Sequence, residues 1–450
     1  MELVDIGDFF ASGYYNEHFI GFLKYNSLAS DKIFILNDYG DDDKIGAFYK
    51  STMTLREFVK NALQNKGTMN KFKRGVYSFI DLKTFFPLVH EQLKSLNRCV
   101  EGQGKWIVYP LFVVARQLYE TCLRLDPIIM KSCGGSNNGK KICQEMWEDC
   151  GRDIHRSFTL CLNDRNPYMP DNRKYGVYMF ANLEFQIYHR LHNKDMIGNL
   201  IKVLESRINV GVTTLNELPS LEESLAGEWR SHIVMFNYYM GQYYGCYMNE
   251  FGKAVEYLTE ALLNCPVDQE YNFDGIVEKI LMLLIPFAIC SNKVYPNLDY
   301  LETRLLKNKK GSQLRVIFDP IIESLRCGNL QLFDSTFQGL ELTFLSNGIY
   351  VVMSHIRPLV LLKMVKRYHA VTCETIIPFA QLLIAYRLSK QEQEQEQEKD
   401  SLEAQMDQLE CSLANLIVGG YIRGYLSHGN RCMVVSKKDP FPRLARRLRK

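Results

Sequence analysis

Apolar side chains recur every three or four residues along most of the chain. Such stripes occupy residues 106–125, 150–162 and 180–191, and polar or glycine-containing segments separate them. This spacing matches the turn of an α-helix and places the apolar positions on one face. The pattern therefore predicts a protein built mainly from amphipathic helices that pack against one another.

Polar segments mark where several of these helices begin and end. Residues 163–167 (Asn-Asp-Arg-Asn-Pro) end the helix of 150–162, and Asn193 is placed to cap a later helix. Residues 66–74 predict a polar connection. Residues 133–141, which include three glycines, predict a flexible loop.

A repeat-like motif lies in the middle of the chain. Its small, aromatic and aliphatic positions are Gly241, Tyr244, Ala254, Leu258 and Ala261, with Pro266 beyond them. The spacing approximates that of tetratricopeptide repeats, with one residue inserted before the alanine. Small residues at these positions let two antiparallel helices pack closely. Stacked pairs leave an apolar end, which predicts a cap at the C-terminal end of the array.

The last hundred residues contain three further helical patterns. The first starts near Gly348 and continues through 351–367, where Pro358 either kinks the helix or lies in the first turn of a new one. The second covers 375–388 and the third covers 402–418. We expect these helices to form the cap.

Two short strand-like stretches complete the cap. Gly419-Gly420 ends the third helix, and the stretches 421–426 and 433–435 follow. Three helices with a small hairpin indicate a winged-helix unit. The Gln-Glu repeat at 391–399 is polar on all sides and predicts a solvated insertion.

The chain is long enough for two to three domains. The predicted organisation is an N-terminal helical region (1–140), a helical-repeat region (141–345), a winged-helix part (346–438) and a basic tail (439–450).

Charge adds one local feature to this picture. The net charge is only +3, so no field of the whole molecule attracts nucleic acid. Basic residues concentrate at the C-terminal end, at Arg431, Lys437, Lys438, Arg443, Arg446, Arg447, Arg449 and Lys450, opposed there by Asp439. The predicted basic surface is therefore confined to the winged-helix region and the tail.

The cysteines predict reduced thiols. There are 13 of them, an odd number, and most lie in apolar helical patterns, as Cys161, Cys246, Cys265, Cys290 and Cys411 do. The acidic start of the chain does not match a secretory signal. The longest apolar run, 280–290, contains Pro286 and is far shorter than the ~20 residues that span a bilayer. We expect a cytosolic or nuclear protein without a membrane span.

Several long segments resemble a known family. They are 150–167 (CGRDIHRSFTLCLNDRNP), 179–191, 238–246 (YYMGQYYGC), 425–432 (YLSHGNRC) and 436–442 (SKKDPFP). Together they resemble the twelfth-subunit family of the COP-nine signalosome, over nearly the whole chain. The Gln-Glu repeat and the Arg-rich end are departures from that pattern.

The resemblance implies a fold and a set of partners. The implied fold is an all-α PCI protein, a right-handed helical-repeat superhelix capped by a C-terminal winged-helix subdomain with a small β-hairpin. The implied role is that of a scaffold subunit in the signalosome and in a nuclear complex for transcription elongation and splicing. Its implied partners are signalosome subunits, a PCI subunit related to the mRNA-export scaffold, and a small acidic disordered protein. Nucleus and cytoplasm are the expected locations.

No pattern in the chain predicts catalysis, a metal or another cofactor. Metal-dependent deneddylation needs two histidines at i and i+2, and no His-x-His pair occurs. His189 and His192 lack a completing ligand set, and Cys161 lies in an apolar stripe, where thiols are usually inert. A metal-dependent isopeptidase subunit is therefore the less favoured alternative. A PCI subunit of the nuclear mRNA-export complex is the nearer one.

Two groups of cations are candidate contact residues. For RNA or DNA at the winged helix they are Lys363, Lys366, Arg367, Arg423, Arg431, Lys437, Lys438 and Arg443. For an acidic partner on the helical repeats they are Lys194, Lys202, Arg207 and Arg230. Solvation of the surface is the alternative role for each of these residues. The sequence leaves open which nucleic acid and which complex are involved.

Overall fold

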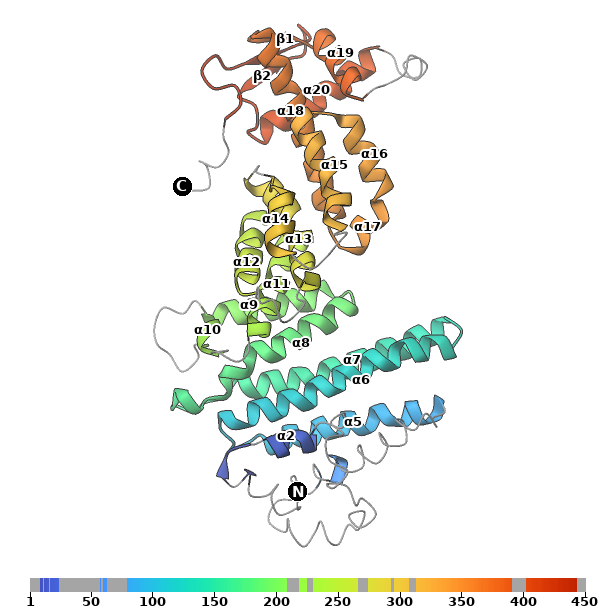
Figure 1. Cartoon of the computed structure of the whole chain (residues 1–450), viewed down its shortest axis with the longest axis vertical. Coiled ribbons are helices and arrows are strands. Elements are labelled where there is room, and N and C mark those ends of the chain that lie inside the picture. Colours follow the sequence, from blue (N-terminus) through green and yellow to red (C-terminus); the bar gives the residue numbers. More distant parts are fainter. Residues whose placement is uncertain are drawn as a thin grey trace. The chain divides into compact units, whose positions relative to one another are not determined.

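The chain divides into two compact units, Met1–Tyr239 and Met240–Lys450 (Figure 1). The structure is a computed structural model, and it describes residues 9–10, 12–15, 17–23, 57, 60–62, 79–208, 218–224, 230–265, 274–292, 295–306, 313–390 and 402–442. The predicted connection at 66–74, the Gln-Glu repeat, Pro266 and residues 443–450 of the tail lie outside this part. The domain ranges predicted from the sequence remain predictions.

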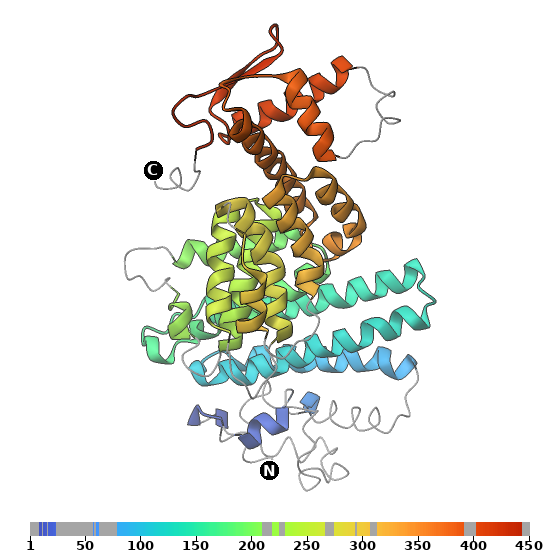
Figure 2. The ribbon, with the colours of Figure 1, turned by 45° about the horizontal axis from the view of Figure 1, so that its top comes forward.

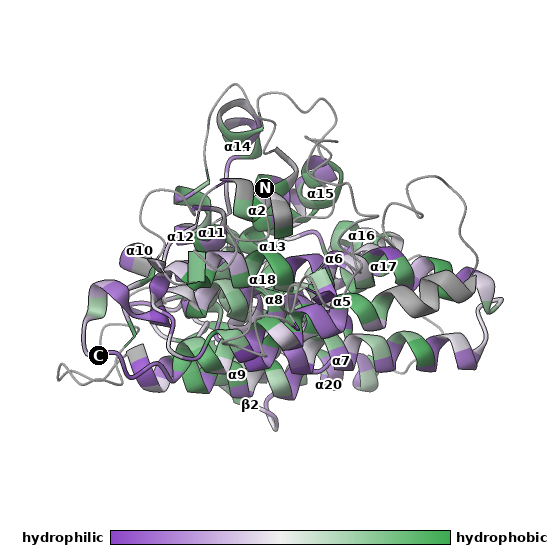
Figure 3. Cartoon of the chain, turned by 90° about the horizontal axis from the view of Figure 1, so that it is seen from below, coloured by the Kyte–Doolittle hydropathy of each residue, from purple (hydrophilic) through white to green (hydrophobic). Residues whose placement is uncertain are grey.

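Helices make up the N-terminal unit. Its described helices of four or more residues are α2 (Glu17–Leu23), α5 (Phe79–Cys99), α6 (Val108–Ser132), α7 (Asn137–Leu162), α8 (Val177–Arg190), α9 (Lys194–Ile208), α10 (Leu221–Ser224) and most of α11 (Arg230–Gln242), with the 3-10 turn η4 (Arg173–Gly176). The long helices α5, α6 and α7 lie side by side (Figures 1 and 2). Both hydrophilic and hydrophobic residues occur along α7 (Figure 3), and its buried residues recur every three or four positions, as the predicted stripes require.

The core of this unit comes from the predicted stripes. Leu111 and Leu118 of α6, Ile154 of α7, and Phe180 and Ile187 of α8 are all fully buried. Burial of each such side chain stabilises the fold by roughly 1.5–3 kcal/mol. The 3.6-residue period in the sequence therefore identified the packing faces correctly.

The predicted flexible loop at 133–141 is wrong in its second half. Asn137 begins α7, and the Ser136 hydroxyl accepts a hydrogen bond from the backbone N–H of Gly139 (3.4 Å), which caps the helix. The turn itself is short, with Gly134 and Gly135 both at positive φ. Asn137, Asn138 and Gly139 are weak helix formers, so the cap at Ser136 decides where the helix begins.

The cap predicted at Asn193 is confirmed. Its side-chain oxygen accepts a hydrogen bond from the backbone N–H of Met196 (3.2 Å) at the start of α9. His192 precedes it with a φ of 53°, so α8 ends and α9 begins within three residues. This tight turn makes α8 and α9 a helix pair.

We expect His232 to make the protein less stable in mild acid. His232 lies on α11, is 7% exposed, and packs edge-on against Phe112 with ring centroids 4.9 Å apart. Burial, with a smaller contribution from Arg116, lowers its pKa from 6.5 to about 4. The unfolded chain therefore binds a proton that the folded chain excludes, so stability is complete above pH 6.5 and is lost as the pH falls toward 4.

The expected loss from His232 is on the order of 2 kcal/mol by pH 4.5. Urea unfolding of the wild-type protein and of His232→Gln at pH 7 and pH 4.5 checks this result. The substitution should reduce the difference in the free energy of unfolding between pH 7 and pH 4.5. An identical pH dependence in both proteins would contradict the prediction.

The C-terminal unit continues with helices and ends in a small sheet. Its described elements are η5 (Tyr243–Tyr247), α12 (Phe251–Leu263), α13 (Asp274–Asn292), α14 (Leu298–Leu305), α15 (Gln313–Cys327), α16 (Leu330–Gly339), α17 (Glu341–Ser346), α18 (Tyr350–Thr372), β1 (Ile376–Pro378), α19 (Phe379–Lys390), α20 (Leu402–Val418), β2 (Gly424–Ser427) and β3 (Cys432–Val435). Within this unit α12 packs on α13, and α18 contacts α13, α15 and α16.

The repeat-like motif forms a close helix contact. A Cβ atom at Gly241 would lie 2.5 Å from the Cγ of Leu258 and 3.2 Å from the carbonyl oxygen of Ala254. Only glycine fits at this crossing. The residues between the two helices include a π-helical turn, Tyr243–Tyr247, and such turns accommodate a single extra residue. This turn explains the residue inserted relative to the tetratricopeptide spacing.

The predicted winged helix is confirmed, with an additional strand. The sheet has the order β1-β3-β2, and β3 pairs antiparallel with both neighbours. Met433 of β3 lies opposite Ile377 and Leu426, and it is fully buried. Pro378 is tolerated because β1 is an outer strand, where a missing N–H costs no interior hydrogen bond.

Two boundaries in this region differ from the prediction. The helix predicted at 375–388 begins only at Phe379, because residues 376–378 pair with β3. Local sequence cannot show this strand, since its partner lies more than fifty residues later. Pro358 lies inside a continuous α18 and does not begin a new helix. The fold class predicted from the sequence, a helical-repeat chain with a C-terminal winged helix, is otherwise confirmed.

Of the five cysteines named in the sequence analysis, three match the predicted burial and two do not. All 13 are unpaired, and Cys161, Cys265 and Cys290 are buried. Cys246 is half-buried and Cys411 is exposed, although both lie in apolar patterns. Among the described residues, no helix has both the length and the apolar character needed to cross a bilayer.

Candidate nucleic-acid interface

After β3 the chain turns back and packs on the winged helix. We call residues 436–442 the strap. Arg423, just before β2, holds the strap at three points: its carbonyl accepts from Ser436 N–H (2.8 Å), its N–H donates to the carbonyl of Pro440 (2.8 Å), and its guanidinium pairs with Asp439 (2.7 Å). The strap is therefore an ordered part of the winged helix.

Phe441 fixes the strap against the second half of α18. Its ring packs edge-on against His369, with centroids 5.4 Å apart. The ammonium group of Lys366 lies 5.6 Å from the centre of the same ring, within the range of a cation–π interaction. The contact places Lys437 and Lys438, both exposed, in the segment that covers this part of α18.

Six of the predicted nucleic-acid residues lie on the second half of α18 or in and beside the strap. We call them the basic face: Lys363, Lys366, Arg367, Arg423, Lys437 and Lys438. Lys363, Lys366 and Arg367 lie on successive turns of α18. Two of the six have internal roles as well, because Arg423 pairs with Asp439 and Arg367 donates to the carbonyl of Cys327 (2.6 Å).

Three lysines of the basic face have no ion-pair partner among the residues that the structure describes, and Asp439, the acidic residue of the strap, pairs with Arg423. Within the described part of the chain, no ion pair links Lys363, Lys437 or Lys438 to a carboxylate. The pKa of Lys366 is lowered, first by partial burial and then by the charge of Lys363. Cations that repel one another without a counter-charge form a favourable position for an anion.

Arg431 is not part of the basic face. It lies just before β3 with a φ of 49°, and its guanidinium pairs with Asp407 and with Glu410 (3.4 Å) on α20. His428 of the same hairpin contacts Glu410 through Nδ1 (2.9 Å). The predicted contact at Arg443 falls outside the described residues.

The carboxylates on α20 are a feature that the sequence analysis missed. Asp407, Glu410 and His428 bring one potential ligand atom each to within 4.8 Å of one another, which is the spacing of a metal site. The guanidinium of Arg431 pairs with both carboxylates there, and its single positive charge offsets one of their two negative charges. A stretch of seventeen helical residues with Glu403, Asp407 and Glu410 and no Lys or Arg was the available sequence signal.

The residues predicted to bind an acidic partner separate into two roles. Lys194 and Lys202 on α9 and Arg230 at the start of α11 are exposed. Arg207 instead donates to the carbonyl of Leu162 (3.3 Å) and to the side chain of Asn163 (3.3 Å), which satisfies the C-terminal end of α7. The structure thus gives Arg207 an internal contact that the sequence does not show.

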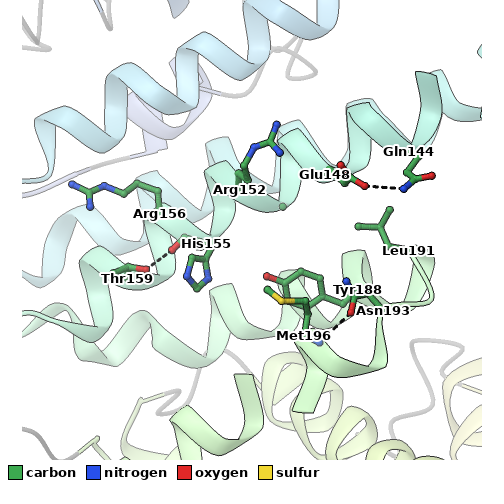
Figure 4. A pocket seen from close by; sticks show the side chains of 11 residues that line it. Gln144, Glu148, Arg152, His155, Arg156, Thr159, Tyr188, Leu191, Asn193 and Met196 are labelled. Carbon is green, nitrogen blue, oxygen red and sulfur yellow. Dashed lines mark hydrogen bonds between the residues drawn. The ribbon is translucent and has the colours of Figure 1, made fainter. Parts of the chain in front are cut away.

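A pocket of about 690 Å³ lies in the N-terminal unit (Figure 4). Its lining residues come from α7, α8 and the start of α9, and they include Arg152, His155, Arg156, Tyr188 and Met196. The ring of His155 points toward Tyr188, whereas the side chains of Arg152 and Arg156 point away from it.

His155 and Tyr188 both contact one buried carboxyl group at this pocket. Glu184 is 1% exposed, accepts a hydrogen bond from the Tyr188 hydroxyl (3.1 Å) and lies 3.2 Å from Nδ1 of His155. Burial raises the pKa of Glu184, and the hydrogen bond to Glu184 raises the pKa of His155. The hydroxyl of Thr159, which also lines the pocket, donates to the carbonyl of His155 (2.7 Å).

His189 and His192 do not form a metal site. His189 is half-buried in the last turn of α8, where burial and then the charge of His192 lower its pKa to about 4. His192 is exposed in the following turn with a left-handed backbone. The two rings therefore differ in environment, and no acidic or cysteine ligand joins them in the described metal-ligand groups.

Helix pairs that end in a three-stranded winged helix define the class of PCI-domain proteins. The model of the PCI domain family matches residues 341–437, which run from α17 to the beginning of the strap. The match includes every residue of the basic face except Lys438.

The chain belongs to the family of COP9 signalosome complex subunit 12. It is 38% identical to "Cop9 signalosome complex subunit 12" of Saccharomyces cerevisiae, over 98% of this chain and 99% of that protein. It is 34% identical to the protein of the same name from Eremothecium gossypii, over 80% of this chain and 83% of that protein. A "PCI domain-containing protein 2 homolog" of Dictyostelium discoideum is 26% identical over 82% of this chain and 77% of its own length.

Proposed function

We propose that this protein is a non-catalytic scaffold subunit that contacts nucleic acid through its winged helix. Its complexes are the COP9 signalosome and a nuclear complex for mRNA biogenesis, which acts in transcription elongation and splicing. It works in the nucleus and the cytoplasm. The signalosome role is supported by the names of the relatives, which describe subunits of that complex.

The two outer strands of the sheet support a role in assembly. β1 and β2 each pair on one side with β3, so their other edges remain available within the described sheet. Ile376 on β1 is 58% exposed and Tyr425 on β2 is 62% exposed. An open strand edge beside exposed apolar side chains suits pairing with another subunit. The partner we propose is a second PCI subunit, related to the mRNA-export scaffold.

A small acidic disordered protein is the other proposed partner. Lys194 and Lys202 on α9 and Arg230 on α11 are exposed cations on the helical repeats. A flexible acidic chain binds such a surface through charge pairing along its length. Arg207 contributes less to this surface, because its guanidinium already contacts Leu162 and Asn163.

The observation that carries the nucleic-acid proposal is the basic face. Lys363, Lys437 and Lys438 have no ion-pair partner in the described structure, and the strap fixes the latter two beside α18. Phosphate groups supply the missing negative charge, and each neutralised phosphate releases a counterion. Binding should therefore weaken steeply as salt concentration rises.

We expect the triple substitution of Lys363, Lys437 and Lys438 by glutamine to weaken nucleic-acid binding about tenfold at moderate salt. The slope of log affinity against log salt should fall by about three, one for each lost phosphate contact. A salt-titrated anisotropy assay measures both quantities, on the protein alone and with its PCI partner and the acidic protein. The matched control replaces Lys131, Lys140 and Lys141, three exposed lysines of the N-terminal unit that lie outside the proposed acidic-partner surface.

Each result of this assay has a defined meaning. Assembly of the triple variant into the complex, with a reduced salt slope, would support the proposal. Equal slopes for the variant, the control and the wild-type protein would rule out the basic face as the contact surface. A wild-type protein that binds no nucleic acid would remove that part of the proposed function and leave the scaffold role.

A further inference from the structure

The charges on the winged helix distinguish two ways of binding nucleic acid. Winged helices commonly dock on a duplex by placing the third helix in the groove and the hairpin on the backbone. In this chain those elements are α20 and the turn between β2 and β3. Their side chains decide whether the duplex mode is available.

The third helix has the wrong charge for a groove. Glu403 and Asp407 on α20 are exposed, and Glu410 is 15% exposed as a side chain, whereas the helix contains no Lys or Arg. Three carboxylates would enter a groove that is lined on both sides by phosphates. Repulsion of this kind opposes docking and gives no hydrogen bonds to the backbone.

The turn between β2 and β3 does not offset the negative charge of α20. Its cationic residues are Arg431 and His428, and both contact carboxylates of α20. The guanidinium of Arg431 would have to leave Asp407 and Glu410 to reach a phosphate. Such a change would leave two carboxylates without their counter-charge at the docking surface.

The basic face has a different composition. It contains an aromatic contact, in which Phe441 of the strap is partly exposed and packs on His369. Lys366 lies over the same ring. Proteins that bind single strands combine cations along the backbone with aromatic rings on which bases stack.

We propose that the nucleic acid bound by this protein is single-stranded and lies across α18 and the strap. The lysines of the basic face contact its phosphates, and the ring of Phe441 stacks on a base. Neither α20 nor the β2–β3 turn takes part. This inference rests on the proposed nucleic-acid contact. It adds that the bound nucleic acid is single-stranded and that α18 and the strap form the surface that binds it.

The test compares single-stranded RNA, single-stranded DNA and the corresponding duplexes, each of about 16 nucleotides or base pairs, which covers one protein site. The full-length protein should bind both single strands at least about tenfold more tightly than either duplex, as measured by anisotropy at one salt concentration. Phe441→Leu should weaken single-strand binding about tenfold, the loss expected for one stacked base. Phe441→Tyr, which keeps an aromatic ring, should restore it.

The control variant is Glu403→Gln on α20. Because α20 takes no part, single-strand affinity should stay within about twofold of wild type. A duplex bound as tightly as the single strands would overturn this inference and leave the proposed function intact. The same holds if Phe441→Leu binds like the wild-type protein. Binding to none of the four oligonucleotides would overturn both.

Discussion

Replacing Gly328 with alanine is expected to destabilise the C-terminal unit by about 3 kcal/mol. Gly328 lies in the turn between α15 and α16 with a φ of 67°. A Cβ atom there would lie 2.7 Å from the backbone nitrogen of Met364 and 2.9 Å from its Cα atom. These are backbone atoms of α18, so no side-chain rotation can relieve the contact.

The surrounding hydrogen bonds keep this turn in place. The N–H groups of Gly328 and Asn329 both donate to the carbonyl of Ser324, at 2.8 and 3.1 Å. The hydroxyl of Ser389 on α19 donates to the Gly328 carbonyl (2.7 Å) and accepts from the N–H of Leu330 (3.0 Å). The alanine variant must therefore either shift α18 or break contacts to two other helices.

Gly339→Ala is the matched control for Gly328→Ala. Gly339 is the last residue of α16, and no atom lies within 4 Å of the position that its Cβ would take. Alanine there should leave stability unchanged or raise it by up to about 1 kcal/mol, because alanine favours the helix. Hydrogen exchange of α15, α16 and α18 measures both variants. Similar exchange rates in Gly328→Ala and in the wild-type protein would contradict the prediction, because they would show that the contact between Gly328 and α18 can relax.

The second large effect is expected at Asp164, between α7 and η4. Replacing it with asparagine should destabilise the N-terminal unit by about 3 kcal/mol. One carboxylate oxygen accepts from the backbone N–H of Arg173 (2.8 Å), and the other accepts from its guanidinium (3.2 Å) and from the N–H of Asn166 (3.2 Å). The substitution would leave the guanidinium of Arg173 buried without a counter-charge.

The pH dependence of this ion pair has a defined sign. Burial of the Asp164 carboxyl raises its pKa, but the hydrogen bonds from Arg173 outweigh burial, and the net pKa lies below 3.8. The folded carboxylate therefore contributes stability that is present above pH 3.8 and is lost as the pH falls through the lowered pKa. The free energy of unfolding of the Asp164→Asn variant should lack this pH-dependent contribution.

Tryptophan fluorescence during urea unfolding measures the Asp164 effect, since Trp106 and Trp147 lie in the same unit. The control is Asp149→Asn, which removes an exposed ion pair with Arg152 within α7 and should cost at most about 0.5 kcal/mol. A second comparison adds Arg173→Met to the Asp164 variant, which removes the unpaired charge and should restore part of the stability. Equal losses for the Asp164 and Asp149 variants would contradict the prediction.

The helix pattern and many of its boundaries were predictable from local sequence. The stripe from 180 to 191, the cap at Asn193 and the Gly419-Gly420 stop all depend on residues within a few positions of one another. Helix formation and capping are governed by such short separations, so the signals survive in the sequence alone. The hairpin of the winged helix was predictable for the same reason.

Elements that need a distant partner were not predictable. Residues 376–378 form β1 because β3 pairs with them, and three residues are too short a stretch to predict a strand without its partner. Asp164 was recognised as part of a helix stop, whereas its contact with Arg173 organises the whole connection to α8. In both cases the deciding interaction joins residues that only folding brings together.

In the candidate nucleic-acid interface, too, some features were predictable from the sequence and others depended on the tertiary structure. The sequence by itself determined that cations accumulate near the C-terminus, that the chain is helical, and that it ends in a winged helix. Only the tertiary structure decided which cations are available, by pairing Arg431 with α20 and by folding the strap and Phe441 onto α18. The physical reason is that the charge of a residue is fixed by its type, whereas the counter-charge beside it is fixed by the fold.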